Sequence, residues 1–307
     1  MRNSTVGEYE KRDIEQQVDR VLRGLGNPEP PLDLREVREL LKLDLEFYSS
    51  ADDDVVKEIV NKVKIGLKQI VWRPTILWDV IKKADLSALW VPDRKRILLD
   101  ATTPKLKHRW FEGHETLHSI TPWHEQFLYG DTAKELNPAC EELIEAEANF
   151  GAGQLLFLRD RFTQEAKDMP MNIATIKSLA KKFGNTITCT LWRYVEVVCD
   201  ETAALGLVSA HPRYVKEAKD PSQPCRHCVE SPKFKEQFAH LTELELFGKL
   251  FGYCKYNKRG SLGEGEVVLT DRNGNDHLFH FESFSIGYDV LTLATYQRKA
   301  PVVVGVG

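Results

Sequence analysis

The sequence predicts an α+β protein, in which a mainly helical domain with a small β-hairpin is followed by a smaller β-containing domain. Apolar residues recur at helical spacing through most of residues 1–205, with a helical insertion at about 51–85. From residue 206 to 307, prolines, turn residues and shorter apolar runs indicate a smaller α/β domain. A chain of 307 residues is long enough to bury two cores.

The composition argues against several classes of function. Hydrophobic residues make up 42% and charged residues 29%, as in ordinary globular proteins. The net charge of −4 gives no bulk attraction to phosphate backbones, so we expect no direct nucleic-acid binding. No run of about 18 apolar residues and no apolar N-terminal signal is present, so we expect no membrane partner. Six scattered cysteines suit reduced thiols and favour a cytoplasmic location.

The N-terminal region predicts two helices and a strand. Residues 8–25 have one apolar stripe and stop at Gly26. After a proline-rich connector, Asp33 and Glu36 predict a capping box for a helix to about Leu43. Residues 45–47 then predict a short strand. The stripe of the first helix consists of Ile14, Val18, Val21, Leu22 and Leu25.

Residues 51–85 predict an inserted pair of helices. Val55, Ile59, Val63 and Leu67 recur at helical spacing, and Pro74 suits the first turn of a second helix. The insertion is interpreted either as packing bulk or as a lid or partner surface near a cleft. Next, residues 88–91 and 96–100 predict two strands joined by a turn. This hairpin would either hold an extended substrate at its edge or support the helix that follows.

The segment Gly113-His114-Glu115-Thr116-Leu117-His118 carries the chemistry. It lies in a helix predicted over residues 105–121 and ended by Pro122. Positions i and i+4 share a helix face, so His114 and His118 can direct two imidazoles at one zinc ion. Glu115 is then placed to act as general base. The alternative is a solvated helix face, and His124 is interpreted as a surface histidine.

A third ligand is expected from a helix predicted over residues 135–158. In it, Glu145 shares a face with Ala148, Asn149, Ala152 and Leu156. The small residues on that face would let the two helices pack closely, with the Glu145 carboxylate at the seam. Glu141 lies one turn earlier and is the alternative ligand, whereas Glu147 points away from Glu145 around the helix.

These motifs resemble the ImmA/IrrE family of metallo-endopeptidases. The resemblance rests on the His-Glu-x-x-His segment and on Glu-x-x-Ala-Asn from Glu145 to Asn149. It extends to the strand at 97–100, to the lead-in at 109–111 and to the helix at 176–184, and covers roughly residues 30–200. Family members usually have Gly where Leu117 stands, Phe where Gly151 stands and Met-Pro where Phe157-Leu158 stand.

The resemblance implies a zincin-like core and a function. One zinc ion per chain, or another divalent ion, would be held by His114, His118 and Glu145, with Glu115 as catalytic base. The partner would be a protein substrate, typically a small helix-turn-helix repressor encoded nearby, so the protein would act in transcription regulation and stress response. The alternative is a catalytically silent zincin-fold regulatory protein that senses a ligand or partner through its C-terminal domain.

The remaining segments predict structure more than chemistry. Residues 173–183 and 186–198 predict two helices joined by a tight turn, with too few basic residues for a DNA-binding pair. Cys225 and Cys228 are expected in an exposed loop, and with His227 they fall short of a four-ligand zinc site. Residues 271–275 predict a hairpin turn between strands at 267–269 and 277–281, and 290–296 predict a last strand.

Overall fold

The computed structural model describes residues 6–48, 88–91, 95–124, 138–218 and 220–300. The chain divides into two compact units. The N-terminal unit comprises Arg2–Arg159 with Phe183–Asn185, and the C-terminal unit comprises Asp160–Lys182 with Thr186–Gly307. Helices and strands are both abundant, so the predicted α+β class is confirmed. The domain boundary expected at residue 205 falls inside strand β4, Ala204–Ser209.

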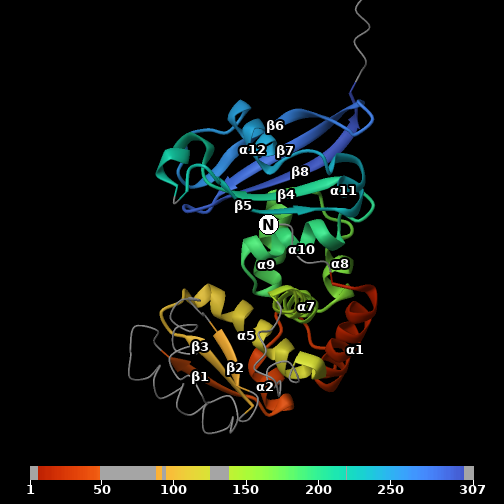
Figure 1. Ribbon diagram of the computed structural model, residues 1–307, viewed down its shortest axis with the longest axis vertical. Coiled ribbons are helices and arrows are strands. Elements are labelled where there is room, and N and C mark those ends of the chain that lie inside the picture. Colours follow the sequence, from red (N-terminus) through yellow and green to blue (C-terminus); the bar gives the residue numbers. More distant parts are fainter. Residues whose placement is uncertain (1–5, 49–87, 92–94, 125–137, 219, 301–307) are drawn as a thin grey trace, which may run out of the picture. The chain divides into compact units, whose positions relative to one another are not determined.

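The N-terminal unit has a three-stranded sheet with its described helices to one side, of which α5 packs on the sheet (Figure 1). Strand β3 is central, with β1 parallel on one side and β2 antiparallel on the other. The hairpin predicted at 88–100 is thereby confirmed. The predicted insertion at 51–85 lies outside the described residues. The elements are α1 (Glu8–Gly24), α2 (Leu34–Leu41), β1 (Asp44–Tyr48), β2 (Ala88–Val91), β3 (Arg96–Asp100), α5 (Lys105–Ile120) and α7 (Pro138–Leu156).

Helix α5 is the organising element of this unit. It packs against strands β2 and β3 and crosses α7, while α1 packs on α7 and α2 on α5. Polar contacts fix its first half, because Arg38 of α2 bonds Glu112 Oε1 at 2.7 Å. Arg109 donates to the carbonyl of Leu32 at 2.8 Å and to Asn185 Oδ1 at 3.0 Å. Helix α5 therefore has fixed neighbours before the histidines begin.

Close packing of α5 against α7 depends on glycine. A Cβ atom added to Gly151 of α7 would overlap Leu117 Cδ1 of α5 and lie 2.7 Å from Leu117 Cγ. A Cβ atom added to Gly113 of α5 would lie 2.9 Å from Leu156 Cδ1 of α7. Leu117 and Leu156 are both fully buried in this seam. The expected packing of α7 against α5 is confirmed, with Leu156 at the seam, but the small residues shown there are Gly113 and Gly151 and not the predicted Ala148 and Ala152.

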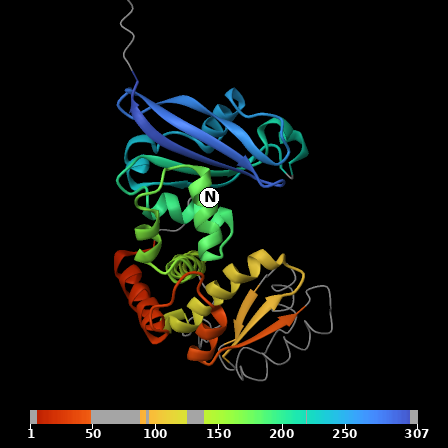
Figure 2. The same cartoon turned by 180° about the vertical axis from the view of Figure 1, so that it is seen from behind.

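The C-terminal unit is a five-stranded antiparallel sheet in the order β5-β4-β8-β7-β6, with helices on both faces (Figure 2). Its strands are β4 (Ala204–Ser209), β5 (Cys225–Glu230), β6 (Gly260–Thr270), β7 (Asp276–Ser285) and β8 (Val290–Lys299). Its helices are α8 (Asp160–Ala166), α9 (Ile173–Phe183), α10 (Ile187–Val197), η2 (Pro212–Glu217), α11 (Pro232–Phe238), α12 (Glu243–Lys249) and η3 (Leu250–Gly252). Both predicted helices and the predicted hairpin are confirmed.

The two faces of this sheet bury different helices. Leu205 and Leu207 of β4 belong to a core that Phe234 and Phe238 of α11 fill from one side. The residue between them points the other way, as alternation along a strand requires. It is Gly206, where an added Cβ atom would lie 3.2 Å from Leu191 Cγ of α10. The missing side chain therefore lets α10 lie close to the central strands.

Cys225 and Cys228 were expected in an exposed loop, and that expectation is wrong. Both lie on strand β5 and are half-buried. The pairing of β4 with β5 shifts register between Val208 and Ser209. A bulge of this kind re-aims side chains, so two cysteines three residues apart both pack against the Phe234 core. Burial raises the pKa of Cys225 to about 12, which keeps the thiol neutral. The five cysteines with described side chains are all free thiols.

Within the described residues, no helix combines the length and the apolar character needed to cross a bilayer.

Candidate metal centre

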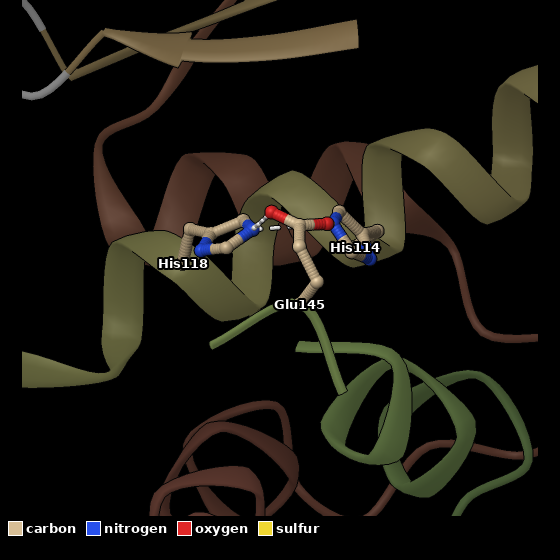
Figure 3. Close-up of side chains that lie close together, drawn as sticks. All are labelled: His114, His118 and Glu145. Carbon is tan, nitrogen blue, oxygen red and sulfur yellow. Dashed lines mark hydrogen bonds and ion pairs between the residues drawn. The ribbon is translucent and has the colours of Figure 1, made fainter. Parts of the chain in front are cut away.

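The structure brings His114, His118 and Glu145 together (Figure 3). Both imidazoles rise from α5, one helical turn apart, and the carboxylate reaches between them from α7. The two Nε2 atoms lie 3.1 Å apart. Glu145 Oε2 lies 3.1 Å from His114 Nε2, and Oε1 lies 3.5 Å from His118 Nε2. This is the only group of its kind among the described residues.

The group fits a tetrahedral metal ion. Nitrogen and oxygen ligands about 2.0–2.2 Å from zinc lie about 3.3–3.6 Å from one another in tetrahedral geometry. The measured separations of 3.1 and 3.5 Å are close to that range. Two imidazoles and one carboxylate form a donor set found at catalytic zinc sites, which leaves one position open. The three residues could therefore hold a metal ion.

The electrostatics of the group also favour a cation. Burial opposes the charged form of His114, but the Glu145 carboxylate and the Glu115 charge raise its pKa above the ordinary value. Partial burial raises the pKa of Glu145, yet the two imidazoles outweigh it and hold that pKa well below its usual range. Glu115 is 7% exposed, so its charge acts inside the protein. A bound cation would compensate both carboxylates.

The exposure of the three residues differs. His114 and His118 are buried, at 9% and 6% exposed. The Glu145 side chain is 53% exposed, so solvent reaches the group from the α7 side. Two buried imidazoles and an exposed carboxylate would leave the fourth position of a tetrahedral metal ion accessible from the Glu145 side. The alternative ligand, Glu141, lies where side chains are outside the described residues.

Asn149 holds the far side of the first histidine. Its Oδ1 lies 3.1 Å from His114 Nδ1. An amide oxygen accepts a hydrogen bond, so Nδ1 of His114 carries a hydrogen and Nε2 is the nitrogen available to a metal ion. Residues i and i+4 share a helix face, so α7 supplies both Glu145 and the partner of His114. Asn149 was expected on this helix face, with no role predicted for it.

His124 was expected at the surface, and that expectation is wrong, because it is 0% exposed. Its Nδ1 lies 3.0 Å from His118 Nδ1, and its Nε2 lies 2.9 Å from Glu147 Oε2. Trp123 Nε1 donates to the same Glu147 oxygen at 2.6 Å. Burial lowers the pKa of His124, outweighing the Glu147 charge that raises it. Glu147 does point away from the metal group, as expected, and its partner there is His124.

Comparisons with known proteins support the fold alone. No protein-family model matches the chain, and no curated protein matches it. Among solved structures, a transcriptional regulator from Mycobacterium tuberculosis is similar, with a TM-score of 0.55 at 10% sequence identity. The match covers 94% of this chain and 76% of that chain. Most of both units therefore has a counterpart in a protein with a nearly unrelated sequence.

Proposed function

We propose that this protein is a zinc-dependent endopeptidase that acts on a protein substrate. The observation that carries the proposal is the convergence of His114, His118 and Glu145, whose donor atoms lie 3.1–3.5 Å apart. A buried glutamate, Glu115, follows the first histidine directly. A site that only stored or was stabilised by a metal would have no use for that second carboxylate.

The residues of the chain divide the chemistry among them. When bound, a zinc ion would supply Lewis acidity, which polarises a carbonyl and makes water more acidic. Glu115 is the general base: it accepts a proton from the attacking water and passes it to the departing amine. His114, His118 and Glu115 are all buried, so bulk water has little access to the base. The exposed side at Glu145 leaves the approach for a peptide chain.

The resemblance to ImmA/IrrE peptidases suggests the substrate. It points to a small helix-turn-helix repressor encoded nearby, so that cleavage would relieve repression under stress. The name of the Mycobacterium tuberculosis neighbour, a transcriptional regulator, is in keeping with a role in transcription regulation. We place the protein in the cytoplasm, where its free thiols would stay reduced.

The substitution Glu115→Gln tests the proposal. It keeps the size of the side chain and removes the base, so zinc content and fold should be unchanged. Cleavage of the neighbouring repressor should fall by about 10²–10⁴-fold, the usual contribution of general base catalysis. Glu39→Gln, an exposed residue on α2, is the matched control and should cleave like the wild type. Zinc is measured by elemental analysis and cleavage by mass spectrometry.

The competing function is a regulatory protein that keeps the metal fold as a scaffold. It predicts that wild type and Glu115→Gln behave alike, both in repressor cleavage and in a cellular derepression assay. Identical behaviour in both assays would reject the peptidase and turn attention to ligands of the C-terminal unit.

A further inference from the structure

A buried chain of hydrogen bonds begins at His118 and runs away from the metal group. It passes through His124 to Glu147, where Trp123 also donates. His124 is 0% and Glu147 3% exposed, so water does not compete for these bonds. Each of the three separations is 3.0 Å or shorter. The donors and acceptors along this series of hydrogen bonds can therefore be assigned, starting from the Glu147 carboxylate.

The order of protons follows from Glu147. A carboxylate only accepts, so Nε2 of His124 carries a hydrogen and donates to Glu147. In a neutral imidazole the other nitrogen is then an acceptor, so Nδ1 of His124 receives a hydrogen from Nδ1 of His118. Nδ1 of His118 therefore carries a hydrogen, and Nε2, which faces His114 and the Glu145 carboxylate, is the nitrogen available to a metal ion. Any other arrangement places a hydrogen where a metal ion would bind.

Two features of the sequence explain where the hydrogen-bonded series from His118 to Glu147 lies. Pro122 follows the end of α5, and the His124 amide donates to the Thr121 carbonyl at 3.0 Å, so the backbone turns back beside His118. Glu147 lies on α7, two residues beyond Glu145, and so on a different face of the same helix. Helix α7 thus carries both Glu145 of the metal group and Glu147, the last residue of the hydrogen-bonded series.

We propose that His124 and Glu147 are positioning residues that fix His118 in the tautomer able to bind the metal. The inference rests on the metal centre of the proposed function and deepens it. Partners of this kind orient metal-ligating histidines, and their loss typically costs about 10–100-fold in metal affinity. Trp123 holds the Glu147 carboxylate from a second direction and should contribute less, because His124 still binds Glu147 without it.

The first experiment needs no metal and no substrate. Long-range proton–nitrogen spectra of the metal-free full-length protein with labelled histidine report which ring nitrogen of His118 carries the hydrogen. Wild type should show His118 protonated at Nδ1. In His124→Phe, which keeps a ring but offers no acceptor, His118 should lose this preference. A purely structural role for His124 predicts that the His118 tautomer stays the same in the folded variant.

The second experiment measures zinc affinity by competition with a chromophoric chelator. His124→Phe and Glu147→Leu should weaken zinc binding by about 10–100-fold. Glu147→Gln keeps an acceptor for His124 and should recover most of the loss. The matched control is His277→Phe, which removes a second buried histidine bonded to a carboxylate, Asp271, far along the chain in the C-terminal unit. It should leave zinc affinity unchanged.

The outcomes separate this inference from the proposed function. Wild-type affinity and an unchanged His118 tautomer in folded His124→Phe would overturn the positioning role, whatever the protein cleaves. Weakened zinc binding together with an inactive wild type would reject the peptidase and keep the positioning role. If His124→Phe fails to fold, Trp123→Phe and the pair Glu147→Gln and Glu147→Leu decide: equal zinc affinity in all three overturns the inference.

Discussion

Two buried histidine–carboxylate pairs, one in each unit, have similar geometry and different neighbours. His124 lies 2.9 Å from Glu147 in the N-terminal unit, and His277 lies 3.1 Å from Asp271 in the C-terminal unit. They differ at the other ring nitrogen. His124 Nδ1 faces His118, whereas the buried His277 Nδ1 has no hydrogen-bond partner among the described residues. Burial and pairing with a carboxylate are therefore common to both histidines, and the group that the second ring nitrogen faces is what distinguishes them.

The surroundings of the two carboxylates differ as well. Glu147 accepts from two side chains, Trp123 and His124, both of which belong to the segment after α5. Asp271 accepts mostly from its own turn, through the amides of Asn273 and Asn275 at 2.8 Å each. The first carboxylate ties two distant segments to each other, and the second closes a hairpin between β6 and β7. Substitution should therefore affect metal binding in one unit and only stability in the other.

The largest expected effect is the loss of metal-linked stability. A ligand that binds only the folded state at 1,000 times its Kd adds about 4 kcal/mol. Chelation should therefore lower the melting temperature of the wild type markedly. In Glu145→Ala, the chelator should have little further effect, because two imidazoles alone hold zinc weakly. The measurement is calorimetry with and without chelator, alongside elemental analysis.

His277→Phe should keep the full response to chelation, because His277 bonds Asp271 within the C-terminal unit. A response of wild-type size in Glu145→Ala would show that Glu145 is not a ligand. Lost response in His277→Phe would break the contrast between the two pairs.

The second effect is the cost of removing the Glu147 carboxylate. Glu147→Leu leaves the Trp123 indole and His124 imidazole N–H groups without their acceptor, in a region where His124 is fully buried. Each buried donor left unpaired costs about 1–3 kcal/mol, and the half-exposed Trp123 should cost less. Urea unfolding of the metal-free protein should show a loss of roughly 2–4 kcal/mol. Asn149→Leu is the comparison, because Asn149 is exposed and water can replace it.

An equal loss of unfolding free energy in Glu147→Leu and Asn149→Leu would mean that burying the hydrogen bonds of His124 and Glu147 adds nothing to stability. If Glu147→Leu lost stability only when zinc was present, Glu147 would contribute to stability through metal binding alone.

Much of the metal group could be predicted from the sequence, because the sequence spacing of residues in a helix determines which face their side chains occupy. The offset from His114 to His118 and the periodicity around Glu145 required only that two helices form. His124 could not be predicted in this way. It follows Pro122, where helical periodicity ends, and a lone histidine after a break has no regular direction. The clue available was Trp123-His124 itself, two residues that seek partners when they are buried.

The C-terminal unit was harder to predict for a different reason. Strand β4 is buried along its whole length, so it lacks the alternation that marks a half-buried strand. The expected domain boundary at residue 205 consequently fell inside it. Two of its helices do have local signals in the sequence, namely Ser231 followed by Pro232 and the capping box between Thr242 and Glu245.

Two differences that limit the resemblance to ImmA/IrrE peptidases meet in the structure. Those peptidases usually have Gly and Phe at the positions of Leu117 and Gly151. The buried Leu117 side chain of α5 lies over Gly151 of α7, so α5 supplies the bulk at this point of the seam and α7 supplies none. The two differences therefore offset each other in volume.

The third prediction uses this seam. Gly151→Ala should strain α5 against α7, since its Cβ would lie 2.7 Å from Leu117 Cγ and 2.9 Å from Ile14 Cγ2. Overpacking costs about 1–3 kcal/mol, more than the 0.5–1 kcal/mol that alanine gains over glycine within a helix. Because His118 adjoins Leu117, zinc affinity should fall too. The double variant Leu117→Gly with Gly151→Phe should recover part of both losses.

Gly206→Ala is the matched change in the C-terminal unit, where the added Cβ would lie 2.7 Å from Val229 Cγ1. It should lower stability to a similar extent and leave zinc affinity unchanged. Both quantities come from urea unfolding and chelator competition on the same samples. A weaker zinc affinity in Gly206→Ala would show that the two units do not act separately.

The smallest expected effect concerns pH and the second pair. Hydrogen bonds from Asn275, followed by those from His277 and the Asn273 amide, hold the pKa of Asp271 well below its usual range. A carboxyl group with a lowered folded-state pKa stabilises the fold above its unfolded pKa, about 3.9, and loses that contribution as pH falls through the folded value. Asp271→Asn removes the charge. It should unfold at lower urea than the wild type near neutral pH, and the gap should narrow below about pH 4. Zinc affinity near neutral pH should be the same in both proteins. If the difference in stability between the two proteins stayed constant with pH, Asp271 would stabilise the fold through the geometry of its turn and not through its charge. The His277–Asp271 pair would then differ in chemistry from the His124–Glu147 pair.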